Sequence, residues 1–162
     1  MTNADLVTLG VFLCPAVQTT KYSAIIPFMF TGTNTAHRNR YAVQVPTFRY
    51  LYAGNFSNIS PRPWEGAYHS SELPMIFGTS GIAHSASTDF EIALSHRMQD
   101  FWLAFISDPM KGLPAQGWNA YEPGGTAVEF GKDRTLVGSI ALSELESVCD
   151  GAAPVPETIP PS

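Results

Sequence analysis

The sequence of 162 residues carries a formal net charge of −5 and is 44% hydrophobic and 14% charged. That length fits one domain, and so apolar a chain can bury a core and is not a disordered protein. The acidic balance offers no basic surface to phosphates, so we expect no nucleic-acid partner. The longest apolar run, 24–30, is interrupted by Pro27 and is shorter than the ~20 residues of a membrane span, so we expect no transmembrane segment.

The two ends of the chain differ in composition. Met1 is followed by T-N-A-D and not by a basic segment with an apolar run, so we expect no signal peptide within this chain. Residues 152–162 contain four prolines, which favours a disordered tail. We therefore expect one domain over residues 1–150 and a proline-rich disordered tail over 151–162.

Residues 47–52 have the composition of a β-strand. They are rich in β-branched and aromatic residues, and Pro46 and Gly54 bound them. A strand that is buried on both faces is apolar throughout, and this run comes close, with Arg49 as the exception.

Residues 89–107 carry the strongest helix signals. Thr88 is placed to cap the N-terminus, and Glu91 completes a capping box. Asp108-Pro109 ends the helix because proline cannot continue the hydrogen-bond ladder. Apolar residues recur at spacings of three and four, which predicts one face packed in a core: Phe90, Leu94, Met98, Phe101, Trp102 and Phe105.

The remaining predicted elements lie near the C-terminus. Residues 128–140 read as a small hairpin that turns around 131–133. Ser143 and Glu146 have the spacing of a second capping box, which predicts a short helix ending at about 149–151.

His69 lies in the motif G-A-Y-H-S-S-E-L, after the predicted strand and a loop rich in Asn, Ser and Pro. A lone histidine is usually structural or solvated, so the residue type alone does not make it functional. The wider pattern, which continues to Phe77-Gly78, resembles the catalytic-histidine segment of type B carboxylesterases, the family of cholinesterases and several fungal lipases. The resemblance includes C-P-A at 14–16 and W-x-x-Y at 118–121, and it extends to about Gly151.

This resemblance implies an α/β fold, namely the C-terminal portion of an α/β-hydrolase fold with the last core strand, the catalytic-histidine loop and the C-terminal helices. Residues 21–34 have no counterpart in the family pattern. They are either a loop insertion or translated non-coding sequence from an incorrect gene model, and both interpretations stay open.

The resemblance also implies ester hydrolysis by a serine, a histidine and a carboxylate. It makes His69 the residue that takes the serine proton and returns it to the leaving alcohol, a task that suits imidazole near neutral pH. Glu72 matches a glutamate that braces the histidine loop, since the family's triad acid comes from a loop well upstream. A metal site at His69 and Glu72 is a weaker interpretation because no second histidine lies at ligand spacing, so we expect no metal and no cofactor.

The other catalytic segments of the family have no match. No G-x-S-x-G elbow, glycine-rich oxyanion-hole segment or acid loop occurs in the sequence. We therefore expect the C-terminal part of a serine carboxylic ester hydrolase for small-molecule or lipid esters, which is inactive on its own. The alternatives are a non-catalytic cholinesterase-like binding or adhesion module and an independent small domain that binds a ligand or partner.

Two further features bear on a secreted, extracellular parent protein, which the family pattern implies. Cys14 and Cys149 fall where secreted type B esterases place a disulfide, so the resemblance implies that they pair; two free buried thiols are the alternative. Asn55 and Asn58 each begin an N-x-S sequon and are glycosylation candidates, although Asn and Ser are also ordinary turn residues.

Overall fold

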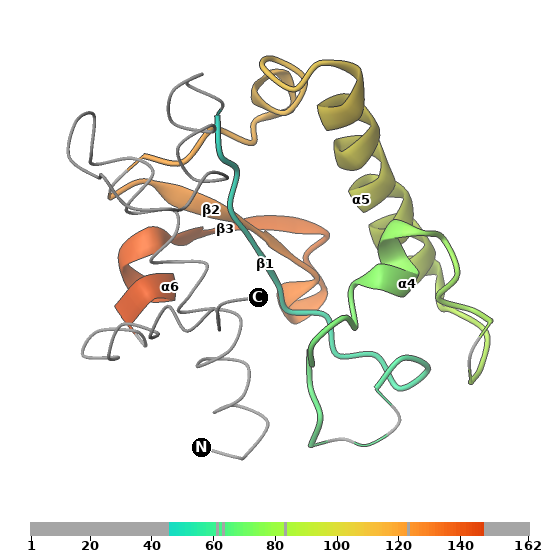
Figure 1. Ribbon diagram of the computed structural model, residues 1–162. Helices are drawn as coiled ribbons and strands as arrows, with labels where there is room; N and C mark the ends of the chain where they lie inside the picture. The colour runs from blue at the N-terminus through green and yellow to red at the C-terminus, as the bar shows by residue number, and fades with distance from the viewer. Residues whose placement is uncertain (1–45, 61, 63, 83, 123, 148–162) are drawn as a thin grey trace, which may run out of the picture.

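The computed structural model describes residues 46–60, 62, 64–82, 84–122 and 124–147 (Figure 1). A three-stranded mixed sheet forms the centre of this part, with helices on both of its faces. In chain order the elements are β1 (Tyr50–Tyr52), α4 (Leu73–Ile76), α5 (Asp89–Ser107), the 3-10 helix η2 (Pro114–Gln116), β2 (Thr126–Phe130), the 3-10 turn η3 (Lys132–Arg134), β3 (Val137–Ala141) and α6 (Leu142–Ser147).

The strands lie in the order β1-β2-β3. β1 pairs with β2 in parallel, with Tyr50 opposite Val128, and β2 pairs with β3 as an antiparallel hairpin. The hairpin prediction is therefore confirmed. Parallel pairing places the carboxyl ends of β1 and β2 at the same edge of the sheet, which is where ligands bind in open α/β sheets.

The predicted strand over residues 47–52 is confirmed but is shorter than expected. The ladder with β2 begins at Tyr50, although the Arg49 carbonyl still accepts a hydrogen bond from Val128 N (3.2 Å). Thr47 O instead accepts from Tyr121 N at 2.6 Å. The partner of the strand thus changes from β2 to the segment around Tyr121, and composition gives no sign of that change.

The two faces of the sheet are covered by different helices. On one face, alternate strand residues such as Tyr50 and Phe130 pack with α5, while on the other face Leu51 packs with α6. Figure 1 shows α5 and α6 on opposite sides of the three strands. This alternation is the period-2 geometry of a strand, and it gives the α/β layering expected from the sequence.

Helix α5 begins and ends where predicted. The Thr88 hydroxyl accepts from Glu91 N at 3.3 Å, and Glu91 Oε2 accepts from Thr88 N at 2.7 Å, so both halves of the capping box form. Asp108 terminates the helix. Most of the apolar stripe packs in the core, but Phe105 is 40% exposed and meets Phe48 edge-on at 6.0 Å between ring centroids.

The capping box predicted for the last helix is wrong. α6 begins at Leu142, directly after β3, so Ser143 is a helical residue and cannot be the N-cap. Leu142 N donates instead to Gly125 O at 3.0 Å. The buried Glu146 side chain faces Arg49, with 3.6 Å between Oε1 and Nη1. Burial lowers the pKa of Arg49 and the Glu146 carboxylate opposes that shift, so this glutamate compensates the one cation in the apolar strand.

No helix in the described residues has both the length and the apolar character required to cross a bilayer.

Candidate active site

His69 lies on the loop that follows the carboxyl end of β1, and its side chain is exposed. Two backbone conformations shape this loop. Gly66 adopts a left-handed conformation (φ 57°), which costs glycine little, and Ser70 does so as well (φ 71°). A left-handed serine directly after His69 is the kind of local strain that proteins retain where a side chain must be presented in a fixed direction.

The first half of the histidine loop is fastened to the chain that leaves β1. The Ser60 hydroxyl donates to Gly66 O at 2.7 Å, and the Tyr68 hydroxyl donates to Ile59 O at 3.1 Å. Ile59 and Ser60 are themselves buried. The residues just before His69 are therefore held by hydrogen bonds to buried residues even though His69 is exposed.

The second half of the loop leads directly into α4. Glu72 is the N-cap residue of α4, and its carbonyl accepts from Met75 N and Ile76 N at 3.0 and 3.1 Å. Met75 is fully buried, and its carbonyl accepts the Ser95 hydroxyl of α5 at 2.6 Å. α5 thus positions α4, and α4 positions the end of the histidine loop.

The Glu72 side chain is half-buried and makes no cap hydrogen bond. Its charge acts on the tyrosines of β1. Burial, and then the Glu72 carboxylate, raise the pKa of Tyr50 to about 12, and the same two causes raise the pKa of Tyr52 further. The Glu72 carboxylate thus lies close enough to the tyrosines of β1 to disfavour their ionisation.

We expect the stability of the fold to decrease as pH rises from about 10 towards about 12. The raised pKa of Tyr50 means that the neutral phenol is favoured in the folded state; this contribution is complete below pH 10 and is lost as pH passes the folded value of about 12. Tyr50→Phe cannot ionise, so its free energy of unfolding should fall less between about pH 9 and about pH 11. The free energy of unfolding is measured by urea unfolding at each pH. If it fell by the same amount in wild type and variant over this pH range, the prediction would be contradicted.

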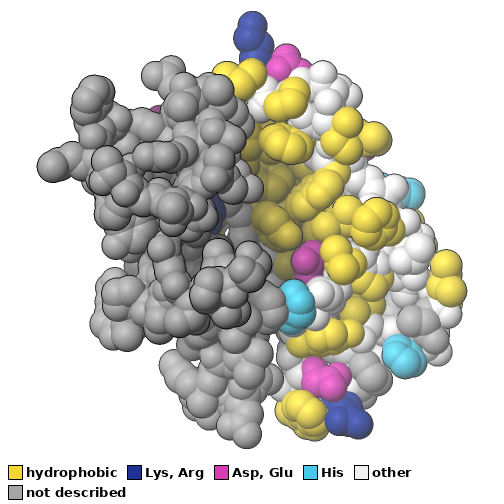
Figure 2. All heavy atoms as spheres, viewed as in Figure 1, with side chains coloured by type: hydrophobic (Ala, Val, Ile, Leu, Met, Phe, Trp, Pro, Cys, Tyr) yellow, Lys and Arg dark blue, Asp and Glu magenta, His cyan; other side chains and the backbone are white. Residues whose placement is uncertain are grey.

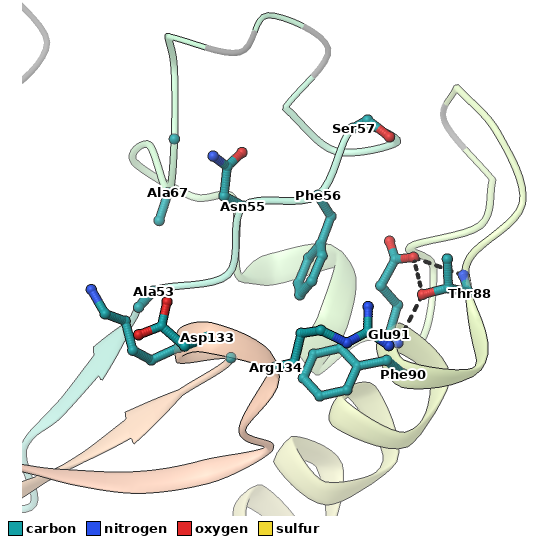
Figure 3. A pocket seen from close by; sticks show the side chains of 13 residues that line it. Ala53, Asn55, Phe56, Ser57, Ala67, Thr88, Phe90, Glu91, Asp133 and Arg134 are labelled. Atoms are coloured by element: carbon teal, nitrogen blue, oxygen red, sulfur yellow. Dashed lines mark hydrogen bonds between the residues drawn. The ribbon is translucent and has the colours of Figure 1, made fainter.

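A cavity of about 710 Å³ adjoins the histidine loop. We call it the β1-exit cavity, because residues just after β1 help to line it. Gly66, Ala67 and Asn55 are among its lining residues. Figure 3 shows the opposite side, where the N-terminus of α5 presents Thr88 and the buried Glu91 with their capping hydrogen bonds. The η3 turn completes the lining, and its backbone is left-handed at two non-glycine residues, Asp133 and Arg134.

The predicted site residues have different surroundings. His69 and Glu72 belong to one tight loop, as the motif implies. Asn55 is exposed, whereas Asn58 is only 3% exposed. Cys14 and Cys149 lie outside the described residues, as do 21–34 and the tail, so the disulfide, the insertion and the disordered tail stay predictions.

Sequence reasoning missed the structural part that Asn58 plays. Its Nδ2 donates to Ser80 O at 3.0 Å and to the Ser87 hydroxyl at 3.3 Å, and the hydroxyls of Ser80 and Ser87 lie 2.8 Å apart. These bonds tie the exit of β1 to the connection between α4 and α5. The partners are 22 and 29 residues away in sequence, so no local pattern could have revealed them.

Comparison with known proteins gives a consistent result. The model of the carboxylesterase family matches residues 4–136. Secreted lipase 5 of Gibberella zeae is 41% identical over 125 residues, covering 62% of this chain and 23% of that protein. A chlorogenic acid esterase of Aspergillus niger is 42% identical over 121 residues, covering 63% of this chain and 24% of that protein. No solved structure matches the chain significantly.

The matched region thus corresponds to about a quarter of the length of these two relatives. The residues matched by the family model include β1, the histidine loop, α5 and β2, which carry the geometry described above. Since the family model matches most of the sequence, this chain belongs to the carboxylesterase family, whose members have the α/β-hydrolase fold.

Proposed function

We propose that this chain is the C-terminal part of a serine carboxylic ester hydrolase and supplies the catalytic histidine, His69. One observation carries the proposal: within the region matched by the family model, the G-A-Y-H-S-S-E-L loop follows the carboxyl end of a strand in a parallel pair. In α/β-hydrolases the triad histidine comes last in the order serine, acid, histidine. The expectation that the histidine loop follows the last core strand is wrong, because β2 and β3 of the same sheet come after it in the chain. The loop after β1 still fits the third place in that order if the serine and the acid come from upstream sequence.

In the proposed mechanism the imidazole of His69 takes the proton of the serine nucleophile as the hydroxyl attacks the ester carbonyl. It then returns the proton to the leaving alcohol, and water repeats the sequence to release the acid. The loop fastenings at Gly66, Tyr68 and α4 support this role, because a general base must be held within hydrogen-bond reach of the group that it deprotonates. Glu72 braces the loop in this proposal and is not the triad acid.

The serine, the acid and the oxyanion hole would come from upstream sequence of the parent protein. Exposed apolar side chains on both sides of His69 in the sequence support a missing neighbour, since Trp64 is 63% exposed and Phe77 71% exposed. Figure 2 shows hydrophobic side chains gathered in a broad band on one face of the described part. Extensive apolar exposure usually marks a contact surface.

The names of the relatives indicate the setting of the parent protein. One is called a secreted lipase and the other an esterase of chlorogenic acid, a small molecule. We therefore place the parent outside the cell, acting on small-molecule or lipid esters.

A chimera tests the proposed function. The segment of the Aspergillus niger esterase that aligns with this chain is replaced by the 162 residues. We expect the chimera to hydrolyse a short-chain p-nitrophenyl ester, whereas the 162-residue chain alone should not, because a triad needs all three members. The relative with its segment deleted is the control. A folded chimera without turnover would contradict the proposal and favour a non-catalytic binding module.

A further inference from the structure

Two glycosylation sequons stand next to each other at the exit of β1. Asn55-Phe56-Ser57 is followed directly by Asn58-Ile59-Ser60, and the motif alone does not rank them. The structure separates the two, because Asn55 is exposed and Asn58 is 3% exposed. Burial in the folded protein therefore decides which of the two asparagines can carry a glycan.

The NH2 group of the Asn58 carboxamide is fully used in hydrogen bonds within the fold. A side-chain amide nitrogen has two hydrogens, and both have acceptors here, Ser80 O at 3.0 Å and Ser87 Oγ at 3.3 Å. A glycan replaces one of these hydrogens and adds a bulky group. The hydroxyl of the same sequon is also engaged, since Ser60 Oγ donates to Gly66 O at 2.7 Å. A glycan on Asn58 would break the hydrogen bonds to Ser80 and Ser87, and the buried position leaves no space for a sugar.

Asn55 has the opposite surroundings. The amides of Ile59 and Ser60 both donate to Phe56 O, so the turn begins just after Asn55. Figure 3 shows the Phe56 ring pointing towards Phe90, with 6.1 Å between ring centroids, and the Asn55 side chain pointing away from it. The Asn55 side chain therefore lies exposed on the lining of the open β1-exit cavity.

We propose that Asn55 is the N-glycan acceptor of this region and that Asn58 stays unmodified as a structural tie. In the transfer, a bond forms between Asn55 Nδ2 and C1 of a sugar while the C1–O bond to the pyrophosphate of a lipid-linked oligosaccharide donor breaks. The lipid pyrophosphate leaves with the oxygen of the broken bond, and the amide nitrogen keeps one hydrogen and loses the other as a proton to the released pyrophosphate or to solvent. The proposal rests on the proposed function only in that the parent enters a secretory pathway.

The test expresses the full 162-residue chain behind a secretory leader in a glycosylating yeast. The secreted, protease-resistant protein is analysed by glycopeptide mapping and by its mass before and after endoglycosidase. Wild type should carry one glycan, at Asn55. Asn55→Gln and Ser57→Ala should both remove it, while Ser57→Thr, which preserves the sequon, should keep it. A glycan on Asn58 in the folded protein, or an unmodified Asn55, would overturn the proposal.

A second measurement does not depend on secretion. In the unglycosylated chain made in bacteria, Asn58→Gln should lower the melting temperature by about 2–4 °C for each hydrogen bond lost, whereas Asn55→Gln should leave it unchanged. Equal melting temperatures for the two variants would refute the proposal that the Asn58 side chain stabilises the fold. Because the leader directs secretion and neither readout uses ester turnover, failure here is distinct from an inactive chimera.

Discussion

His69→Ala in the chimera is expected to lower ester turnover by about 10⁴-fold or more while the protein stays folded. Without the imidazole, the serine keeps its proton during attack and the leaving alcohol receives none, so both halves of the reaction fail together. The exposed position of His69 means that truncation removes little packing. The measurement is kcat on a p-nitrophenyl ester, with far-UV circular dichroism as the check on folding.

Two variants make this result specific. His96 is also an exposed histidine, but it lies on α5, so His96→Ala should leave turnover within about twofold. Glu72→Gln should affect turnover far less than His69→Ala and should mainly reduce stability, because its proposed task is to brace the loop. Turnover that survives His69→Ala would show that the chemistry lies elsewhere in the molecule.

The parts of the fold that the sequence predicted well are those with local signals. Helix α5 is specified by a capping box that spans Thr88 and Glu91, an apolar stripe and a proline after Asp108, all within its own length. The structure reproduces these bounds. The β2–β3 hairpin was also predictable, because its strands flank a short turn that opens on the left-handed Gly131.

The errors arose where distant residues decide the structure. Glu146 had the right spacing for a capping box with Ser143, but burial beside Arg49 draws this side chain to a strand almost a hundred residues earlier. The true start of β1 depends on Tyr121 in the same way. Spacing rules describe one element at a time, and they carry no information about partners brought together by folding.

The candidate site shows the same division. The motif around His69 was sufficient to single out this histidine, because the pattern is contiguous in sequence. The bonds that position its loop were not predictable, since they join Ser60 and Tyr68 to backbone groups chosen by the turn geometry. The hydrogen bonds of Asn58 were not predictable for the same reason: its partners in the α4–α5 connection become visible only in three dimensions.

Trp118→Ala is expected to lower the free energy of unfolding of the chain by about 3–5 kcal/mol. The side chain is 4% exposed and lies at the centre of the larger core. It meets five aromatic rings at centroid distances between 5.3 and 6.2 Å, from Phe48, Tyr50, Phe101, Trp102 and Phe130. Because these rings come from β1 and the residues just before it, from α5 and from β2, a cavity at Trp118 removes contacts from all of these parts at once.

Trp118→Phe separates packing from hydrogen bonding. The indole nitrogen donates to Arg49 O at 3.1 Å, but this carbonyl also accepts from Val128 N, so losing the indole leaves it partnered. Phenylalanine should therefore cost clearly less than alanine. Trp64→Ala, at a 63% exposed tryptophan, is the matched control and should change stability by no more than about 0.5 kcal/mol. If urea unfolding gave Trp118→Ala and Trp64→Ala the same stability, Trp118 would not be the centre of this core.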